Sequence, residues 1–164
     1  MKTTKEIQQE WAEAKLHEQH RYERQGKMEA ASKYEACSMF KGTEDLDGMI
    51  DLMFTAQGIE FCTRAGFPAM DVFEQFLKTD PETLKKRGIY VNCGRISLCD
   101  PKDVYLIGNT SAEIKTRETA LNRVVCLHGA KAAVIAGGYS VVKTASDAKS
   151  WIFYTEIEHG RILR

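Results

Sequence analysis

The stretch KAAVIAGGYSVVKTASDAKSWIFYTEI, residues 131–157, decides the fold of this chain. Apolar and polar residues alternate along it with a period of two, and β-branched residues are frequent, which is typical of strands. Gly137–Gly138 and Ala145–Asp147 interrupt the alternation and predict turns. We therefore expect three short strands separated by tight turns.

The same alternation begins at Gly88 and continues through five earlier segments, GIYVN, RISL, DVYLIG, AEIKT and RVVCLHG. A mostly apolar residue recurs in these segments every 8–12 residues, forming a first column: Tyr90, Leu98, Leu106, Ile114, Cys126, Val134, Val142, Ile152 and Ile162. Smaller residues stand two positions earlier, forming a second column: Ile96, Val104, Ala112, Val124, Ala132, Ser140 and Ser150. This pattern favours a β-solenoid, in which each coil buries its inward side chains against the next. An antiparallel β-sandwich or meander has similar strand spacing and remains the alternative.

Residues before Gly88 have helical rather than strand periodicity. Residues 5–39 are rich in Glu, Gln, Lys and Ala, which predicts a helical arm over 1–41 with a break near Gly26 and a thin apolar stripe. Residues 42–87 predict a helical cap that starts with an N-cap at Thr43, runs to Gly66 and resumes after Pro68. The predicted fold is therefore α+β: N-terminal helices followed by a short β-solenoid over 88–164.

Composition and charge exclude several classes of function. The 164 residues are 43% hydrophobic, and 23 basic residues balance 23 acidic ones, so no net field attracts a polyanion and nucleic-acid binding is disfavoured. No apolar run is long enough to span a membrane, and the N-terminus MKTTKEIQQEW is too polar for a secretory signal. The five cysteines contain no Cys-x-x-Cys pair, which favours reduced thiols. We expect a cytoplasmic or virion-associated protein that does not bind membranes.

The segment HGAKAAVIAGGYSVVKTASDAKSWIF, residues 128–153, resembles a degenerate Ala-x-Val-x-Ala-x-Gly repeat. Such repeats occur in uncharacterised proteins of gut bacteria and their phages, where they are regarded as short β-solenoids. The preceding segments LMFTAQGIEFC, FPAMDVFEQFL and GIYVNCGRISL resemble the lead-in of these proteins, so the resemblance covers roughly residues 46–164. It implies a phage or mobile-element setting and a role in binding or assembly, and it carries no catalytic motif.

Candidate chemistry centres on Cys126 and His128, which lie two residues apart on a predicted strand and so share a face. With Cys93 and Cys99 they suggest a zinc site, and alone they suggest a thiol–imidazole pair. Cys126 stands in the first column, however, where a small buried hydrophobic residue is the simpler interpretation. No phosphate-binding loop and no G-x-S-x-G motif is present. We expect no enzymatic activity, no cofactor and no bound metal.

Binding is expected at loops and exposed aromatic residues. The long interval between Ile114 and Cys126 predicts a polar loop over 117–122, and loops on a rigid scaffold commonly carry binding sites. Two tryptophans are candidate contact anchors because large aromatic side chains dominate interfaces. The candidate interaction residues are Trp11, Arg117, Glu118, Asn122 and Trp151.

A solenoid exposes strand edges at its ends, and no recognisable cap follows Ile162 in the sequence. We expect a second copy of the chain, or its N-terminal helix, to cover this end. The predicted function is therefore a non-enzymatic, homo-oligomeric binding or assembly protein of phage or mobile-element type, with a protein partner through the N-terminal helix. The alternative is a small-ligand-binding protein or small enzyme with a cleft near residues 117–122.

Overall fold

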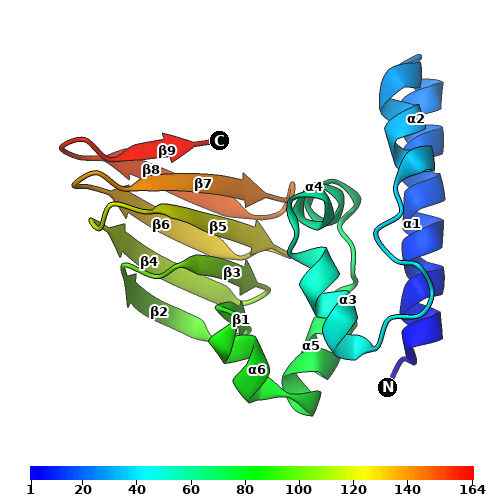
Figure 1. The fold of residues 1–164 in the computed structure, drawn as a ribbon, viewed down its shortest axis with the longest axis horizontal. Helices are drawn as coiled ribbons and strands as arrows, with labels where there is room; N and C mark the ends of the chain where they lie inside the picture. The colour runs from blue at the N-terminus through cyan, green and yellow to red at the C-terminus, as the bar shows by residue number, and fades with distance from the viewer. The chain divides into compact units, whose positions relative to one another are not determined.

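The fold is α+β, with helices in the first half of the chain and strands in the second (Figure 1). The computed structural model describes all 164 residues, and their contacts divide the chain into two compact units, Met1–Val72 and Phe73–Arg164. The helices are α1 (Thr4–Arg24), α2 (Met28–Ala36), α3 (Leu46–Met53), α4 (Ala56–Ala65), α5 (Met70–Thr79) and α6 (Pro81–Lys86). None of them combines the length and the apolar character needed to cross a membrane.

The first unit begins with two helices separated by a break at Gly26. Thr3 and Glu6 form a capping box at the start of α1, in which Thr3 Oγ1 accepts from the Glu6 amide at 3.3 Å and Glu6 Oε2 accepts from the Thr3 amide at 2.6 Å. The helix ends at Arg24, and Gly26 has a left-handed backbone with φ of 71°. The predicted break near Gly26 is confirmed.

Between residues 42 and 66 the structure corrects the sequence analysis. The N-cap is Asp45, not Thr43: its Oδ1 accepts from the Gly48 amide at 2.8 Å. The helix does not run through to Gly66, because Thr55 starts a new one, α4, by accepting from the Gly58 amide at 3.1 Å. A short polar side chain that bonds the backbone competes with helix continuation, and this local bond decides the break. The predicted end of α4 at Gly66 is confirmed, with φ of 64°.

The second unit contains a β-solenoid of parallel strands. Sheet A has the order β1-β3-β5-β7-β9 and sheet B the order β2-β4-β6-β8, so the chain alternates between the two sheets. The strands are β1 (Ile89–Val91), β2 (Gly94–Cys99), β3 (Asp103–Ile107), β4 (Thr110–Thr116), β5 (Leu121–Leu127), β6 (Lys131–Ala136), β7 (Val141–Ser146), β8 (Trp151–Glu156) and β9 (Arg161–Leu163). This architecture confirms the solenoid and excludes the antiparallel alternative, because every pair is parallel.

The strand register explains the spacing in the sequence. Ile89 pairs with Tyr105, an offset of 16 residues, whereas Leu121 pairs with Val141, an offset of 20. One coil therefore contains two strand units, and the 8–12-residue interval of the sequence corresponds to about half a coil. Successive residues of the first column alternate between the sheets. The column keeps its register as far as Val134, and then it slips by four residues, so Val142 pairs with Asn122 and not with Cys126.

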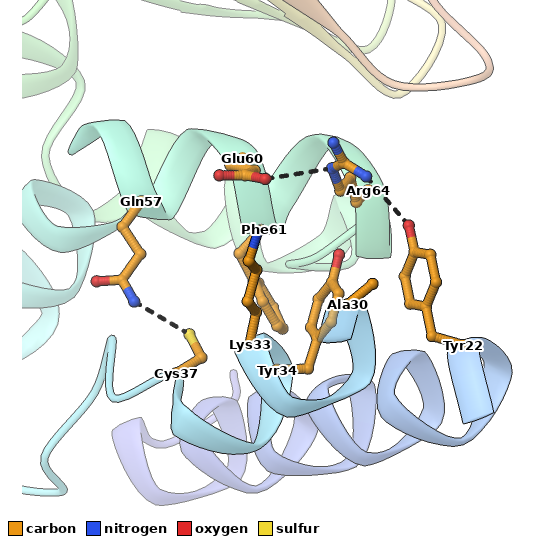
Figure 2. Close-up of a pocket in the computed structure, with 9 residues that line it drawn as sticks. All are labelled: Tyr22, Ala30, Lys33, Tyr34, Cys37, Gln57, Glu60, Phe61 and Arg64. Atoms are coloured by element: carbon orange, nitrogen blue, oxygen red, sulfur yellow. Dashed lines mark hydrogen bonds and ion pairs between the residues drawn. The ribbon is translucent and has the colours of Figure 1, made fainter. Parts of the chain in front are cut away.

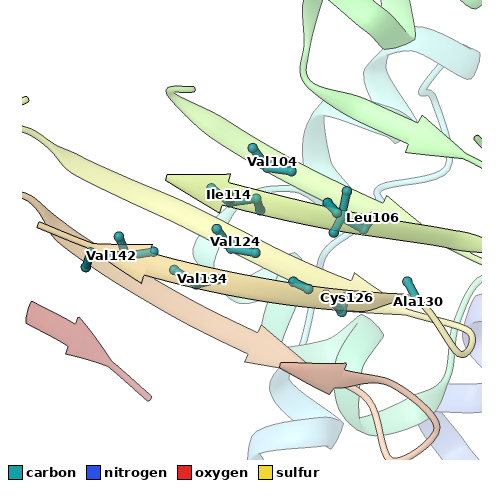
Figure 3. Packing of buried hydrophobic residues seen from close by; sticks show 11 residues of the cluster. Val104, Leu106, Ile114, Val124, Cys126, Ala130, Val134 and Val142 are labelled. Carbon is teal, nitrogen blue, oxygen red and sulfur yellow. The ribbon is translucent and has the colours of Figure 1, made fainter. Parts of the chain in front are cut away.

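The solenoid core consists of the inward residues of both sheets (Figure 3). Leu106 stacks on Cys126 in sheet A, and Ile114 stacks on Val134 in sheet B, each at most 1% exposed. Burying an aliphatic side chain of this size stabilises the fold by about 1.5–3 kcal/mol. Ser140, from the second column, is also buried, and its hydroxyl is 2.8 Å from that of Thr116.

Polar side chains hold the turns of neighbouring coils together. Asp100 Oδ1 accepts from the Arg117 amide at 2.6 Å and the Glu118 amide at 3.0 Å. Asp147 Oδ2 accepts from the His128 amide at 2.7 Å. These bonds satisfy amides that the strand ladders leave without a backbone partner, and so they rigidify the coil edges.

Candidate functional site

The two predicted tryptophans occupy different environments. Trp11 is half-buried within the helical unit, where its ring centroid lies 5.5 Å from that of Phe40 and 6.3 Å from that of Phe61. The Lys15 ammonium lies 5.4 Å from the same ring. Trp151, by contrast, is 62% exposed on β8. The proposed use of the N-terminal helix as a protein-docking element stays a prediction.

The loop that the sequence predicts over 117–122 is shorter in the structure: residues 117–120 connect β4 to β5 and are exposed. Leu121 and Asn122 belong to β5, and Asn122 is buried, with its side-chain amide donating to the Pro101 carbonyl. Arg117 and Glu118 are exposed, but Asp100 holds their amides in a turn next to the preceding coil. The four extra residues of this interval lie in the turn from sheet B to sheet A, and β5 begins directly after that turn, at Leu121.

Cys126 and His128 do not share a face. Cys126 points into the core with no exposed surface, and burial raises the pKa of its thiol to about 12. His128 lies in the turn after β5 with φ of 57°, and its ring centroid is 5.7 Å from that of Phe73. The positive φ breaks the strand alternation on which the shared face depended. No cluster of three or more His, Cys, Asp or Glu side chains is arranged to hold a metal ion.

An apolar surface lies on β8, at the edge of sheet B; we call it the β8 edge surface and define it by Trp151–Thr155. Phe153 is 64% exposed and lies on the outward face beside Trp151, while Ile152 and Tyr154 point inward and are half-buried. The guanidinium of Arg164 lies 4.3 Å from the centroid of the Tyr154 ring. Exposed aromatic side chains that lie together on one face are candidate interaction sites in soluble proteins.

The neighbouring edge strand, β9, is protected differently. The Glu156 carboxylate accepts from the Ile162 amide at 2.7 Å, so a side chain occupies a backbone donor on this strand. Native edge strands are commonly blocked by charged side chains in this way. Residues 151–155 of β8 carry no charge, and the carboxylate of Glu156 bonds β9 and not the edge of β8 itself.

A pocket lies in the helical unit, between α2 and α4; we call it the α2–α4 pocket (Figure 2). Its volume is about 210 Å³, and its lining consists of Tyr22, Ala30, Lys33, Tyr34, Cys37, Gln57, Glu60, Phe61 and Arg64. The lining residues of α4, and those of α2 together with its C-cap Cys37, follow the spacing i, i+3, i+4, i+7, which places each set on one side of its helix. Two such faces therefore meet around the pocket.

Aromatic rings and a guanidinium group dominate this pocket. The rings of Tyr22 and Tyr34 stack with centroids 5.5 Å apart, and the Phe61 ring lies 6.1 Å from that of Tyr34. Arg64 Nη1 donates to the Tyr22 hydroxyl at 3.1 Å, which lowers the pKa of Tyr22. Burial raises the pKa of Tyr34 to about 12, so this hydroxyl stays protonated at neutral pH.

Sequence reasoning missed both Phe153 and the pocket residues. Phe153 could have been found from Trp151, because residues i and i+2 of a strand lie on the same face. The pocket has a weaker signal: aromatic and polar residues at helical spacing in 30–37 and 57–64 give no indication that the two faces meet. Comparisons with protein families, with characterised proteins and with solved structures find no match to this chain. The resemblance to phage and gut-bacterial repeat proteins stays a prediction.

Proposed function

We propose that this chain is a non-enzymatic assembly protein that forms a homodimer through the β8 edge surface. The observation that carries the proposal is an edge strand whose residues 151–155 carry no charge and which exposes two aromatic side chains, Trp151 and Phe153. Its free backbone groups are a template for pairing with another strand. A second copy supplies an identical strand, which gives a closed two-fold interface.

Antiparallel pairing centred on Phe153 preserves the two faces of the strand. In this register Phe153 lies opposite Phe153 of the second copy, Trp151 opposite Thr155, and Ile152 opposite Tyr154. Outward residues then meet outward residues and inward residues meet inward ones, as the period of a strand requires. Aromatic and β-branched cross-strand pairs each contribute about 0.2–1 kcal/mol relative to alanine pairs.

The charges that flank the strand are complementary in the same register. No charged residue lies within 151–155, so pairing brings no like charges into direct opposition. Lys149 lies in the turn before β8 and Glu156 ends the strand, so antiparallel pairing brings the basic end of one copy near the acidic end of the other. Opposite charges at the rim favour this register and disfavour a shifted one. This charge pattern is the reason to assign a second copy as the partner.

The self-pairing of Phe153 makes the proposal testable by light scattering. We expect the wild-type chain to show twice its 18.5 kDa mass at micromolar concentration. Phe153→Lys places two ammonium groups opposite each other, and Phe153→Glu places two carboxylates, so each variant alone should be monomeric. Mixing the two variants pairs opposite charges and should restore the dimer mass.

Leu121→Lys is the matched control, because Leu121 is 70% exposed but lies on β5, inside sheet A. This variant should remain dimeric. A monomeric wild-type chain, or a Phe153→Lys variant that keeps the dimer mass, would contradict the proposal. The phage or mobile-element setting is a separate prediction that this experiment does not address.

A further inference from the structure

The α2–α4 pocket, far in sequence from the strand used for assembly, combines an apolar wall with polar groups at one end. Phe61 is 3% exposed and forms part of the wall together with Ala30. Figure 2 shows the hydroxyls of Tyr22 and Tyr34 pointing to the same side, toward the Arg64 guanidinium. A small apolar pocket with a few convergent polar groups is the usual form of a ligand site.

The charges around the pocket favour an anion. Lys33 and Arg64 are the two cations in the lining, and Glu60 is the one carboxylate. Glu60 lies 3.5 Å from Arg64 Nε, but its side chain is 68% exposed, so solvent screens the pair. Lys33 contacts Glu29 at 3.8 Å, and that carboxylate is 92% exposed. The Arg64 and Lys33 side chains are themselves 52% and 76% exposed, so both cations are accessible to a second anion that enters the pocket from solvent.

The polar end of the pocket offers hydrogen-bond donors that suit a carboxylate. Arg64 donates Nη1 to the Tyr22 hydroxyl, which accepts with a lone pair and keeps its own proton to donate. The Tyr34 hydroxyl supplies a second O–H donor on the same side. Two hydroxyl donors and a planar guanidinium suit the two oxygens of one carboxylate, and hydrogen bonds to a charged acceptor are the strong ones.

Size limits the apolar part of the ligand to about one ring. A volume of about 210 Å³ corresponds to roughly seven water molecules at about 30 Å³ each. Phe61 and Tyr34 present ring surfaces, and aromatic pairs prefer offset or edge-to-face contact, which a single flat ring can adopt against them. We propose that the α2–α4 pocket binds a small arylcarboxylate, with its carboxylate at Arg64 and its ring against Phe61 and Ala30.

Titration of the full chain with benzoate, followed by amide chemical shifts in NMR spectra, tests this site. Benzoate should cause saturable shifts in α2 and α4 with a dissociation constant in the millimolar range or tighter. Benzamide keeps the ring and loses the charge, and acetate keeps the charge and loses the ring. Each should bind at least about tenfold more weakly, the equivalent of one charge-assisted hydrogen bond for benzamide.

Two variants and a control locate the binding. Arg64→Gln removes the guanidinium and should weaken benzoate binding at least about tenfold. Ala30→Leu fills the pocket without changing any charge, so it tests the site even if Arg64→Gln disturbs the fold; it should abolish the saturable shifts. Arg24→Gln removes an exposed cation from the last turn of α1, outside the lining, and should leave the dissociation constant within twofold.

Three results would overturn the proposal. Equal affinity for benzoate and benzamide would show that the cations do not contribute. Unchanged benzoate affinity in Ala30→Leu would show that the ligand binds elsewhere. Shifts confined to the strands β1–β9 would assign the binding to the other unit.

Discussion

Asp100 stabilises the turn of the next coil with one carboxylate oxygen. That oxygen accepts from two consecutive amides, Arg117 and Glu118, and these bonds lower the pKa of Asp100 below its usual range. The folded state therefore binds this proton more weakly than the unfolded state does. The resulting stabilisation is present above the usual carboxyl pKa and is lost as pH falls through the folded value.

Asp100→Asn should separate this charge effect from the hydrogen bonds themselves. The amide oxygen of asparagine still accepts from the turn, but it does not titrate near neutral or acidic pH. We expect the wild-type chain to have the higher urea midpoint at about pH 6, and the difference from the variant to shrink toward about pH 3. A difference that stays constant over this range would contradict the assignment.

At the residue scale, sequence reasoning worked where burial follows a strict period. Leu106, Ile114 and Val134 are core residues as the first column predicts, because inward positions of a strand recur every second residue. It failed at His128, where one left-handed residue ends the alternation. The environments of Tyr22 and Arg64 could not be predicted, because their contact joins residues 42 positions apart.

In the solenoid, the geometry of the turns between strands sets how closely neighbouring coils approach each other. Gly138, in the turn between β6 and β7, has φ of 56°, and a Cβ there would lie 2.3 Å from the Arg117 carbonyl oxygen. Gly94, at the start of β2, has a similar φ of 68° but no atom within 4 Å of such a Cβ. Both glycines have a left-handed backbone, but only at Gly138 is the neighbouring coil close enough to contact an added Cβ.

Comparing Gly138→Ala with Gly94→Ala separates the cost of the close contact between coils from the cost of the left-handed backbone. Both variants should lower the free energy of unfolding by about 1 kcal/mol, because a residue with a Cβ adopts the left-handed conformation less readily than glycine does. Gly138→Ala should lose a further 1–3 kcal/mol or so, because a carbonyl of the adjacent coil must move. The measurement is hydrogen exchange of amides in β6 and β7 under increasing urea. Equal losses in the two variants would show that the coils tolerate a wider spacing.

At the scale of elements, the strand periods carry more information than the helix boundaries. The intervals between residues of the first column predict the strands, because a four-residue insertion in a turn leaves the next strand in phase. The division of residues 46–65 into α3 and α4 depends on one hydroxyl, that of Thr55, which accepts from the Gly58 amide. Threonine favours N-caps but also occurs inside helices, so the sequence alone does not show which bond forms.

At the scale of the whole molecule, each unit contains its own core. The helical unit buries residues such as Ile7, Met49 and Met53, while the second unit buries the inward residues of both sheets. Helices α2, α3 and α4 have 8–10 residues each, and helices of this length depend on packing for stability. In the solenoid, parallel ladders join every coil to its neighbours.

We therefore expect the two units to unfold at different urea concentrations, with the helical unit first. The chain has two tryptophans, and Trp151→Phe keeps an aromatic side chain on β8 while leaving Trp11 as the single fluorescent indole. Trp11 packs against Phe40 and Phe61, so its emission reports on the helical unit. Hydrogen exchange of amides in β5 and β6 reports on the solenoid. A single urea midpoint shared by both measurements would show that the units unfold together, and it would make the stability of each core depend on the other.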